Sequence, residues 1–556
     1  MTPGTAGAAG RGGDQQAATR SDQPAGNGRG RGSSKSRGSS KNSNRAAQKS
    51  TSRSPAGRAD PARRTAVDVL RGVDERDAYA NLLLPALLRE RGLTGRDAAL
   101  ATELSYGTLR GQGSYDAILA VCSDRDLAAV DPPLRQVLRL GAHQLLATRV
   151  RPHAAVATSV DLARYVAGPR PAGFVNAVLR RVATRDLPGW LDIVAPGRAE
   201  DLVGHLSVRY SHPRWIVMAL SAALGEAEAG GLAETEAALA ADGRRPAVTL
   251  CAVPGLASRA ELVAAGSQPA RWSEFGAYLP DGDPGDVPAV AQGRAGVQDE
   301  ASQLAALALA RAETSGTDRG RWLDMCAGPG GKARLLAGLA AARGAGLLAA
   351  DVREHRARLV MTALGGAARA GLAAAPGTAG ADAGTAGADA RTAGPAAGRP
   401  GAAAVIAADG TAPAWRPGSF DRVLADVPCS GLGALRRRPE ARWRRSPQDI
   451  PGLSGLQREL LATAIESARP GGVVAYVTCS PHLAETRDVV GGVLASRGDV
   501  EVLDAPGVLA GVPGLCCPAP DGRFAQFWPH RHGTDAIFLA LLRRGAHAWP
   551  QGGEQR

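Results

Sequence analysis

Two cysteines occur in similar local settings in a chain of 556 residues that has only seven. Cys429 lies in "ADVPCSGLG", residues 425–433, and Cys479 lies in "YVTCSP", residues 476–481. In each segment a Cys-Ser step directly follows an apolar run. A cysteine at a strand end is most often a small buried hydrophobic residue. A pair of them indicates covalent chemistry, in which one thiolate attacks a substrate and a second group assists its release.

Polar side chains also end other short apolar segments in the same half of the chain. In an open α/β sheet, ligands bind outside the carboxyl ends of the strands. One acid at a strand end is ordinary, but five strands that end this way predict a single shared site. The side chains concerned are Asp324 with Cys326, Asp351, Asp409, Asp426 with Cys429, and Cys479.

The first of these strand ends leads into a glycine-rich turn, "DMCAGPGGKA", residues 324–333. Glycines there let the backbone approach a ligand closely and leave helix N-terminal amides free for a polar group. The turn lacks the G-x-x-x-x-G-K-[ST] pattern of an ATP-binding P-loop. Asp351 follows about twenty residues later, a spacing that suits hydrogen bonds to ribose hydroxyls. An adenosine-bearing cofactor fits, and the spacing alone leaves NAD and S-adenosylmethionine equally possible.

Hydrophobic periodicity divides the chain into regions of different kinds. Spacings of three and four predict an all-helical domain, and later the alternation of short apolar strands with helices predicts a doubly wound α/β domain with a parallel sheet. The predicted order is a basic tail (1–60), the helical domain (61–190), a linker with a small α+β subdomain (191–300), the α/β domain (301–545) with a Gly/Ala-rich insertion (371–403), and a C-terminal tail (546–556).

The net charge of +13 is concentrated in residues 1–60, which hold eleven Lys or Arg and three Asp. This stretch has no aromatic residue and too little apolar surface to offset its ordering entropy, so we expect it to be disordered, as we do the insertion. Two interpretations of the tail remain open: loose RNA binding through phosphate contacts, and a solubilising extension.

The remaining global features concern the environment of the protein. The chain lacks a secretory signal and any run of about 18 apolar residues, so we expect a soluble, cytoplasmic protein without membrane contact. The cysteines are odd in number and lack zinc-type spacing, which favours reduced thiols and no metal site. Oligomeric state leaves no signature in the sequence.

Three segments, in this order, carry a family resemblance: "DMCAGPGGKA", "ADVPCSGLG" and "YVTCSP". They resemble the RNA cytosine-5 methyltransferases that use S-adenosylmethionine, and the likeness extends through "GVQDEASQLAA", "LRRRPEARW" and "FWPHRHGTDAIFLALLRR". The helical region resembles the NusB-like RNA-binding domain. The pairing is similar to the branch of the family that modifies a cytosine of 16S rRNA. The resemblance implies an all-α NusB-like domain followed by a Rossmann-like methyltransferase domain, with 16S rRNA as partner.

The resemblance also implies roles for individual residues. Carbon 5 of cytosine is a poor nucleophile, and a thiolate that adds to carbon 6 activates it. By the family pattern Cys479 is this nucleophile, Cys429 assists breakdown of the adduct, and Asp426 hydrogen-bonds the cytosine near ring nitrogen 3. The residues that line the S-adenosylmethionine pocket would be Cys326, Ala327, Gly328, Pro329, Gly330, Gly331, Lys332, Asp351, Asp409 and Asp426.

The sequence departs from the family pattern at two positions of the cofactor turn. Gly328 stands where alanine is usual, and Ala333 stands where threonine or serine is usual. Neither change touches the reactive cysteines. An arginine run follows the Cys429 turn, and with Trp443 in it we favour contact with single-stranded RNA over a solvated face. Its members are Arg436, Arg437, Arg438, Arg442, Arg444 and Arg445.

Several alternatives remain at this point. The substrate could instead be tRNA, 23S rRNA or DNA, although DNA cytosine-5 methyltransferases employ the Pro-Cys cysteine alone and the NusB-like region favours small-subunit rRNA. A non-catalytic NusB-like RNA-binding or antitermination factor would have no need of both cysteines. A nicotinamide-dependent oxidoreductase leaves the two Cys-Ser turns and the arginine run without a purpose.

Overall fold

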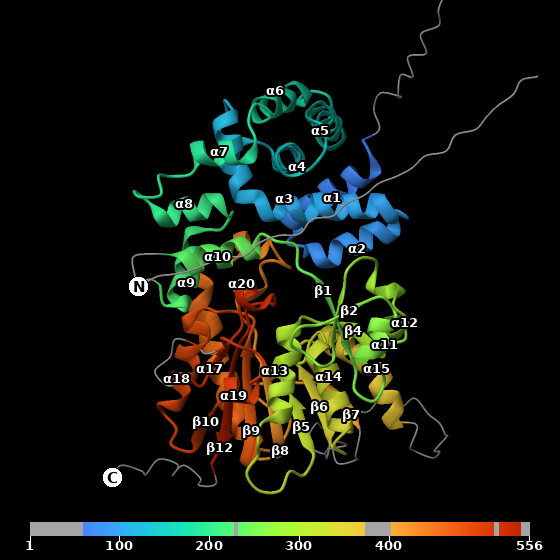
Figure 1. Ribbon diagram of the computed structural model, residues 1–556, viewed down its shortest axis with the longest axis vertical. Helices are drawn as coiled ribbons and strands as arrows, with labels where there is room; N and C mark the ends of the chain where they lie inside the picture. The colour runs from blue at the N-terminus through green and yellow to red at the C-terminus, as the bar shows by residue number, and fades with distance from the viewer. Residues whose placement is uncertain (1–58, 227–231, 373–401, 516, 518–521, 546–556) are drawn as a thin grey trace, which may run out of the picture. The chain divides into compact units, whose positions relative to one another are not determined.

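The computed structural model describes residues 59–226, 232–372, 402–515, 517 and 522–545 (Figure 1). Nearly all of the predicted basic tail, the Gly/Ala-rich insertion and the C-terminal tail lie outside the described residues. At the edges of the insertion, helix α15 runs to Leu372 and strand β7 begins at Ala403.

The first described region is entirely helical, as predicted. Asp60 caps α1 by accepting a hydrogen bond from the Arg63 amide at 2.9 Å, and α4 and α5 each begin at a proline, which suits the first helical turn. Leu70, Leu104 and Leu138 are buried in one core between these helices. The helices are α1 (Pro61–Arg76), α2 (Ala80–Glu90), α3 (Gly95–Cys122), α4 (Pro132–Ala147), α5 (Pro152–Ala167), α6 (Ala172–Val182) and α7 (Leu187–Val194).

A junction of three helices and a small sheet follows. The sheet is antiparallel with the order β2-β3-β1-β4, and Leu250, Leu262 and Ala277 form its core. The helices of the junction pack against Leu432 and Leu435, which lie just after Cys429. The elements are α8 (Leu202–Arg209), α9 (Arg214–Leu224), α10 (Ala233–Asp242), β1 (Val248–Ala252), α11 (Arg259–Ala264), β2 (Gln268–Pro269), β3 (Gly276–Leu279), α12 (Pro288–Ala291) and β4 (Ala295–Val297).

The last region is built on a large sheet with the order β10-β12-β9-β8-β5-β6-β7, and β11 pairs with β12. The five strands from β9 to β7 in this order pair in parallel, whereas β12 and β10 add antiparallel pairs at the other end. The strands are β5 (Arg321–Asp324), β6 (Gly346–Asp351), β7 (Ala403–Ala407), β8 (Phe420–Asp426), β9 (Ala468–Thr478), β10 (Val500–Leu503), β11 (Ala525–Gln526) and β12 (Phe538–Arg544).

Helices cover both faces of this sheet, which confirms the doubly wound α/β class. Trp322 and Leu424 face the core that contains α13 and α14, whereas their neighbours Leu323 and Val423 face the core that contains α17 and α18. Such alternation is expected of strands buried on both sides. The helices are α13 (Glu300–Arg311), α14 (Gly331–Ala341), α15 (Glu354–Leu372), α16 (Ala441–Arg444), α17 (Ile450–Ser467), α18 (Arg487–Leu494), α19 (Ala505–Val508) and α20 (Pro529–His532).

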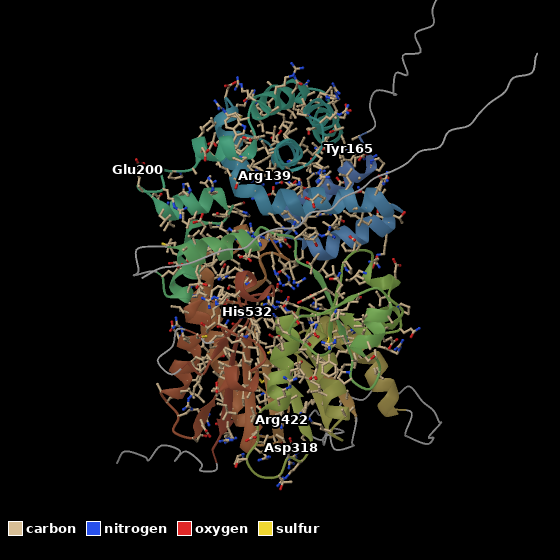
Figure 2. All side chains as sticks on the ribbon, in the orientation of Figure 1. Arg139, Tyr165, Glu200, Asp318, Arg422 and His532 are labelled. Carbon is tan, nitrogen blue, oxygen red and sulfur yellow. The ribbon has the colours of Figure 1, made fainter. Side chains whose placement is uncertain are left out.

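A buried arginine stabilises the edge of the sheet at which the parallel strands begin, their amino edge. Arg422, near the start of β8, pairs with Asp318 at 3.2 Å and donates to the carbonyl oxygens of Leu309 and Ala312 (Figure 2). The loop after α13 is thereby held to this edge, and the opposite, carboxyl edge is left for a binding site. Within the described ranges, no helix has the length and apolar character needed to cross a bilayer.

Candidate active site

The carboxyl edge of the parallel strands carries the side chains that the sequence singled out. Asp426, Asp324 and Asp351 are the last residues of β8, β5 and β6, while Cys479 directly follows β9 and Asp409 lies two residues beyond β7. Because these strands are neighbours in the order β9-β8-β5-β6-β7, the predicted common edge is confirmed.

The two cysteines meet at this edge. The sulfur atoms of Cys429 and Cys479 are 3.1 Å apart, within hydrogen-bonding distance, and both side chains are half-buried. The hydrogen bond lowers the pKa of Cys479, against the effects of burial and of Asp426, and the positive charges of Lys332 and Arg438 lower it further. The same bond, with burial, raises the pKa of Cys429 well above its usual value. The two shifts favour the thiolate at Cys479 and the protonated thiol at Cys429.

A lysine links the cofactor turn to the cysteine pair. Lys332, in the first turn of α14, donates to Asp426 at 2.8 Å. Burial opposes the charge of Lys332, but the Asp426 carboxylate outweighs burial and raises the pKa of the ammonium group. Lys332 thus stays positive beside the Cys479 thiol, where a positive charge favours the thiolate.

Replacing Lys332 with methionine is expected to raise the pH midpoint of Cys479 reactivity by about one unit or more. The change removes a charge that lowers the Cys479 pKa and leaves Asp426, which raises it, without its partner. The rate of iodoacetamide alkylation of Cys479, followed by mass spectrometry of its peptide over a pH series, measures the shift. Lys332→Arg retains the charge and serves as control. An unchanged midpoint in Lys332→Met would contradict this role.

The glycine turn approaches Asp351 closely. The Gly328 amide donates to the Asp351 carboxylate at 3.0 Å, and the Gly328 carbonyl accepts from Arg356 at 2.6 Å. A Cβ atom at residue 328 would collide with this carboxylate and with Arg356. The departure from the family pattern at Gly328 therefore suits the close contact between turn and carboxylate in this chain.

Asp324, the first residue of the same turn, is a buried acid. It has no exposed surface, and neither carboxyl oxygen accepts a hydrogen bond from the described residues. Burial, with the charge of Asp426, raises its pKa to about 8. Burial also raises the pKa of the neighbouring Cys326, so this thiol stays protonated. An unsatisfied acid beside a glycine turn fits a cofactor that brings hydrogen-bond donors or positive charge, as S-adenosylmethionine does.

Replacing Asp324 with asparagine is expected to stabilise the protein at pH 9 and to change its stability little near pH 4. With a pKa of about 8 against a usual 3.8, the folded state keeps a proton that the unfolded chain loses. Stability therefore falls as pH rises between these two values. Each unit of raised pKa corresponds to about 1.4 kcal/mol of unfolding free energy, so we expect a gain of a few kcal/mol at pH 9.

Urea unfolding of the wild type and Asp324→Asn at both pH values measures this difference. Asp281→Asn, at an exposed acid, is the matched control and should change stability equally little at both. A destabilised Asp324→Asn at pH 9 would show that the buried carboxylate has stabilising partners in solution.

Asp409 is placed next to Asp351 but is exposed. The Ala408 amide donates to the Asp351 carbonyl at 3.1 Å, and the carboxylate of Asp409 accepts from the amide and hydroxyl of Thr411, which lower its pKa. The structure thus brings the whole predicted cofactor set, from Cys326–Lys332 to Asp409, to one edge. The individual contacts of these residues with a cofactor stay a prediction.

The arginine run serves mainly internal contacts, so the RNA contact predicted for it is wrong at Arg442. This side chain is fully buried and donates to the carbonyl oxygens of Arg110, Ser211 and Asp242. Arg444 donates to carbonyl oxygens at the end of α1 and just beyond it. Sequence reasoning could not see these acceptors, because backbone carbonyls carry no residue signature.

Arg436 and Arg437 are also occupied internally. Both pair with Asp299 and Asp535 at distances of 2.7 to 3.2 Å. Arg438 differs, since it is exposed and its charge favours the Cys479 thiolate. Of this run, Arg438 is therefore the residue best placed to meet a substrate phosphate near the cysteines.

A functional residue that sequence reasoning missed is Glu485. It is fully buried and hydrogen-bonds the serines that follow both cysteines. The sequence offers only an acid six residues after Cys479. This signal is weak, because the sequence does not show which side chains surround Glu485.

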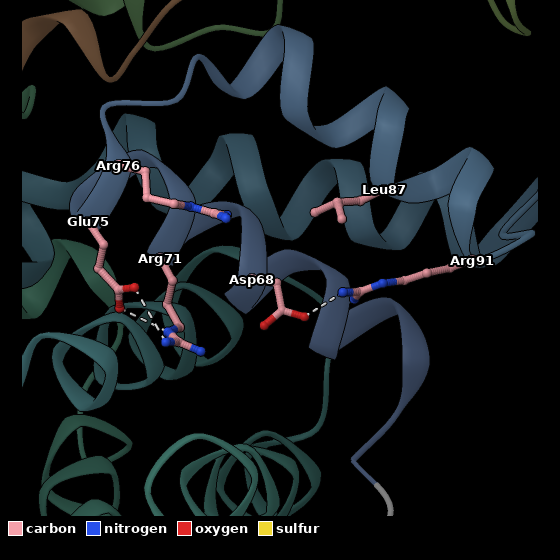
Figure 3. Close-up of a pocket in the computed structure, with 6 residues that line it drawn as sticks. All are labelled: Asp68, Arg71, Glu75, Arg76, Leu87 and Arg91. Carbon is pink, nitrogen blue, oxygen red and sulfur yellow. Dashed lines mark hydrogen bonds and ion pairs between the residues drawn. The ribbon is translucent and has the colours of Figure 1, made fainter.

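A cavity of about 300 Å³ lies elsewhere, in the helical region between α1 and α2 (Figure 3). Two of its arginines are held by acids of α1, in the pairs Arg71–Glu75 at 3.0 Å and Arg91–Asp68 at 2.7 Å. The cavity contains no nucleophile and is lined by Asp68, Arg71, Glu75, Arg76, Leu87 and Arg91. This cavity therefore has no counterpart to the paired thiols at the carboxyl edge of the sheet.

Comparison with known proteins agrees with this geometry. The family model for 16S rRNA methyltransferase RsmB/F matches residues 312–373 and 399–543, and the NusB family model matches residues 60–184. A putative methyltransferase of Mycobacterium tuberculosis (strain H37Rv) is 48% identical over 89% of this chain and 99% of its own length.

Two further similarities cover most of the chain. The ribosomal RNA small subunit methyltransferase B of Pseudomonas putida (strain KT2440) is 32% identical over 84% of this chain and 94% of its own length. The crystal structure of PH0851 superposes with a TM-score of 0.65 at 20% identity, covering 87% of this chain and 98% of that one, and so shares the fold. From these matches and the site, the chain belongs to the RsmB/F family of 16S rRNA methyltransferases and is an RNA methyltransferase with a NusB-like helical domain.

Proposed function

We propose that the protein transfers a methyl group from S-adenosylmethionine to carbon 5 of a cytosine in 16S rRNA through a covalent adduct with Cys479. The observation that carries this proposal is the cysteine pair. Two thiols 3.1 Å apart, with pKa values shifted in opposite directions, supply one nucleophile and one proton donor.

The mechanism assigns a separate task to each side chain. The Cys479 thiolate adds to carbon 6 of the cytosine, and the electron pair moves toward carbon 5 and ring nitrogen 3. Lys332 keeps Asp426 oriented by their 2.8 Å bond, so that the carboxylate can accept a hydrogen bond from the exocyclic amino group beside nitrogen 3, while the positive charge of Lys332 offsets the negative charge that develops on the ring. S-adenosylmethionine, when bound, supplies an electrophilic methyl group for carbon 5.

The second half of the reaction regenerates the enzyme. A base takes the proton from carbon 5, the carbon–sulfur bond breaks, and its electron pair returns to Cys479. Cys429 donates its S–H toward the departing sulfur over the 3.1 Å contact, which stabilises the thiolate as it forms. This arrangement explains why two cysteines are needed where one nucleophile would start the reaction.

The cofactor would be held by the glycine turn and the acids at the strand ends. Cys326–Lys332 supply backbone groups close to the ligand, Asp351 and Asp409 suit the ribose and base, and Asp324 offers unfilled acceptors beside them. A cytosine inside a duplex hides carbon 6, so the target base must be unpaired or flipped out.

The choice of 16S rRNA is supported by the family model and by the names of the relatives. The NusB-like region also favours an RNA partner. A cytoplasmic location follows from this proposal, because ribosomal RNA is the substrate.

Transfer of labelled methyl groups from S-adenosylmethionine to 16S rRNA, 23S rRNA and tRNA tests the proposal. We expect 5-methylcytosine at one position of 16S rRNA and at least about 100-fold less label in the other RNAs. Label in tRNA or 23S rRNA would leave the chemistry intact and change the substrate. Label at a position other than carbon 5 would overturn the adduct mechanism. If no free RNA is labelled, assembling small subunits are the next substrate to test.

A further inference from the structure

Both Cys-Ser turns hydrogen-bond to one buried carboxylate. Glu485 ends the short 3₁₀ helix η6 (Leu483–Glu485), which follows the Cys479 turn, and it has no exposed surface. The Ser430 amide donates to its Oε1 atom at 2.7 Å, and the Ser430 hydroxyl donates to Oε2 at 2.5 Å. The Ser480 hydroxyl donates to the same Oε2 atom at 2.7 Å. The residue after each cysteine is therefore tied to the same carboxylate, and the two serine hydroxyls share its Oε2 atom.

The surroundings hold Glu485 itself in place. Gln457 of α17 donates from one amide nitrogen both to Glu485 Oε1 at 3.1 Å and to the Pro428 carbonyl at 2.8 Å. The Tyr476 hydroxyl donates to the Glu485 carbonyl at 2.7 Å. The side chains that donate hydrogen bonds to this carboxylate, Ser430, Ser480 and Gln457, are all neutral, and its negative charge opposes the lowering of the His482 pKa by burial. A buried carboxylate satisfied in this way is costly to rearrange.

We propose that Glu485 is a positioning residue for the methyl-transfer reaction: its carboxylate fixes the two Cys-Ser turns against each other and so holds the sulfur atoms of Cys429 and Cys479 in contact. This role rests on the proposed function, because it matters only if both thiols act. Glu485 does not touch the reacting atoms in this arrangement. It acts through Ser430 and Ser480.

The carboxylate also affects which cysteine holds the proton. The hydrogen bond to Cys479, burial and the charge of Cys479 are the largest causes of the raised Cys429 pKa. The negative charge of Glu485 adds to them. The other charged groups that act on the pair are Asp426, Lys332 and Arg438, and these act on Cys479. Glu485 thus helps to keep the proton on Cys429, while Lys332 and Arg438 favour the Cys479 thiolate and Asp426 opposes it.

The test is the relative reactivity of the two cysteines in Glu485→Gln, an isosteric change that removes the charge. At neutral pH the wild type should alkylate at Cys479 at least about tenfold faster than at Cys429, and the variant should lower this ratio to about threefold or less. Quantitative mass spectrometry of the two peptides after iodoacetamide treatment gives the ratio. Local unfolding that exposed both thiols would also bring the ratio toward one, so the comparison is made on a variant whose circular dichroism and thermal unfolding midpoint match those of the wild type.

Glu459→Gln is the matched control, because Glu459 is exposed on α17, the helix that also carries Gln457. If Glu485→Gln fails to fold, Ser430→Ala and Ser480→Ala each remove one hydroxyl donor and should lower the ratio by smaller steps. In the methylation assay Glu485→Gln should lower kcat by about 50-fold or more with KM for RNA and cofactor within about threefold.

The outcomes separate this inference from the proposed function. The alkylation ratio needs no RNA, so it tests Glu485 even if the wild type methylates none of the RNAs offered. A folded Glu485→Gln protein with the wild-type ratio and wild-type kcat would overturn the positioning role. Loss of kcat with an unchanged ratio would also overturn it, since Glu485 would then act by a route other than the cysteine pair.

Discussion

Replacing Cys479 with alanine is expected to reduce methyl transfer by at least about 10⁴-fold, to the level of no enzyme. The variant keeps the cofactor turn and the NusB-like region, but it removes the atom that bonds to carbon 6 in the proposed mechanism. Without that bond, carbon 5 stays too weak a nucleophile to accept the methyl group. Labelled methyl transfer to RNA measures the loss, while cofactor and RNA binding should stay within about threefold of wild type.

Cys122→Ala is a suitable control for this experiment. Cys122 is buried at the end of α3 in the helical region, so its loss costs some stability and leaves the reaction unchanged. Because burial raises the pKa of its thiol, it cannot substitute for the nucleophile. Substantial transfer by Cys479→Ala, with Cys429→Ala inactive, would exchange the roles of the two cysteines.

Replacing Cys429 with alanine is expected to trap the protein on its RNA. Cys479 would still attack, although more slowly, because the hydrogen bond that lowers its pKa is lost. Breakdown of the methylated adduct would lack the S–H that stabilises the leaving thiolate. The expected result is a protein–RNA complex that survives denaturing gel electrophoresis, with turnover reduced by about 100-fold or more.

The double variant Cys429→Ala/Cys479→Ala identifies the bonded atom. It should form no such complex, since the nucleophile is absent. A complex that persists in the double variant would place the covalent bond on another residue. Formation of the complex only when S-adenosylmethionine is present would show that methylation precedes the blocked step.

The alternatives that the sequence left open are resolved to different degrees. The family assignment excludes a nicotinamide-dependent oxidoreductase, and a purely RNA-binding factor does not account for two thiols brought into contact. The choice among 16S rRNA, 23S rRNA and tRNA belongs to the transfer experiment, because recognition of an RNA depends on surfaces that the cysteine geometry does not describe.

Much of the site could be predicted from local sequence. Parallel strands buried on both faces are read from short apolar runs, and their carboxyl ends must share one edge. This rule predicts the positions of Asp324, Asp351 and Asp426, and the structure confirms that they lie at that edge. The Gly-rich turn likewise indicates a cofactor, because glycines at this position let the backbone approach a ligand closely.

The arginine run shows where local sequence misleads. A cluster of arginines with a tryptophan has the composition of an RNA-binding surface, and the pattern does not reveal which carbonyl oxygens or acids lie nearby. Arg442 is instead the buried link between the loop after Cys429 and the carbonyl oxygens of Arg110, Ser211 and Asp242. Its bonding partners lie 200 to 332 residues away along the chain.

By itself, then, the sequence determined the fold class and the shared edge of the sheet at which the strand-end acids and the two cysteines lie. Only the tertiary structure decided that the sulfur atoms of Cys429 and Cys479 lie 3.1 Å apart and that Glu485 ties their turns together. The physical reason is that periodicity encodes which face or edge a residue occupies. The contact between two segments fifty residues apart depends on how the strands and loops pack. The same packing decides which of two coupled thiols loses its proton first.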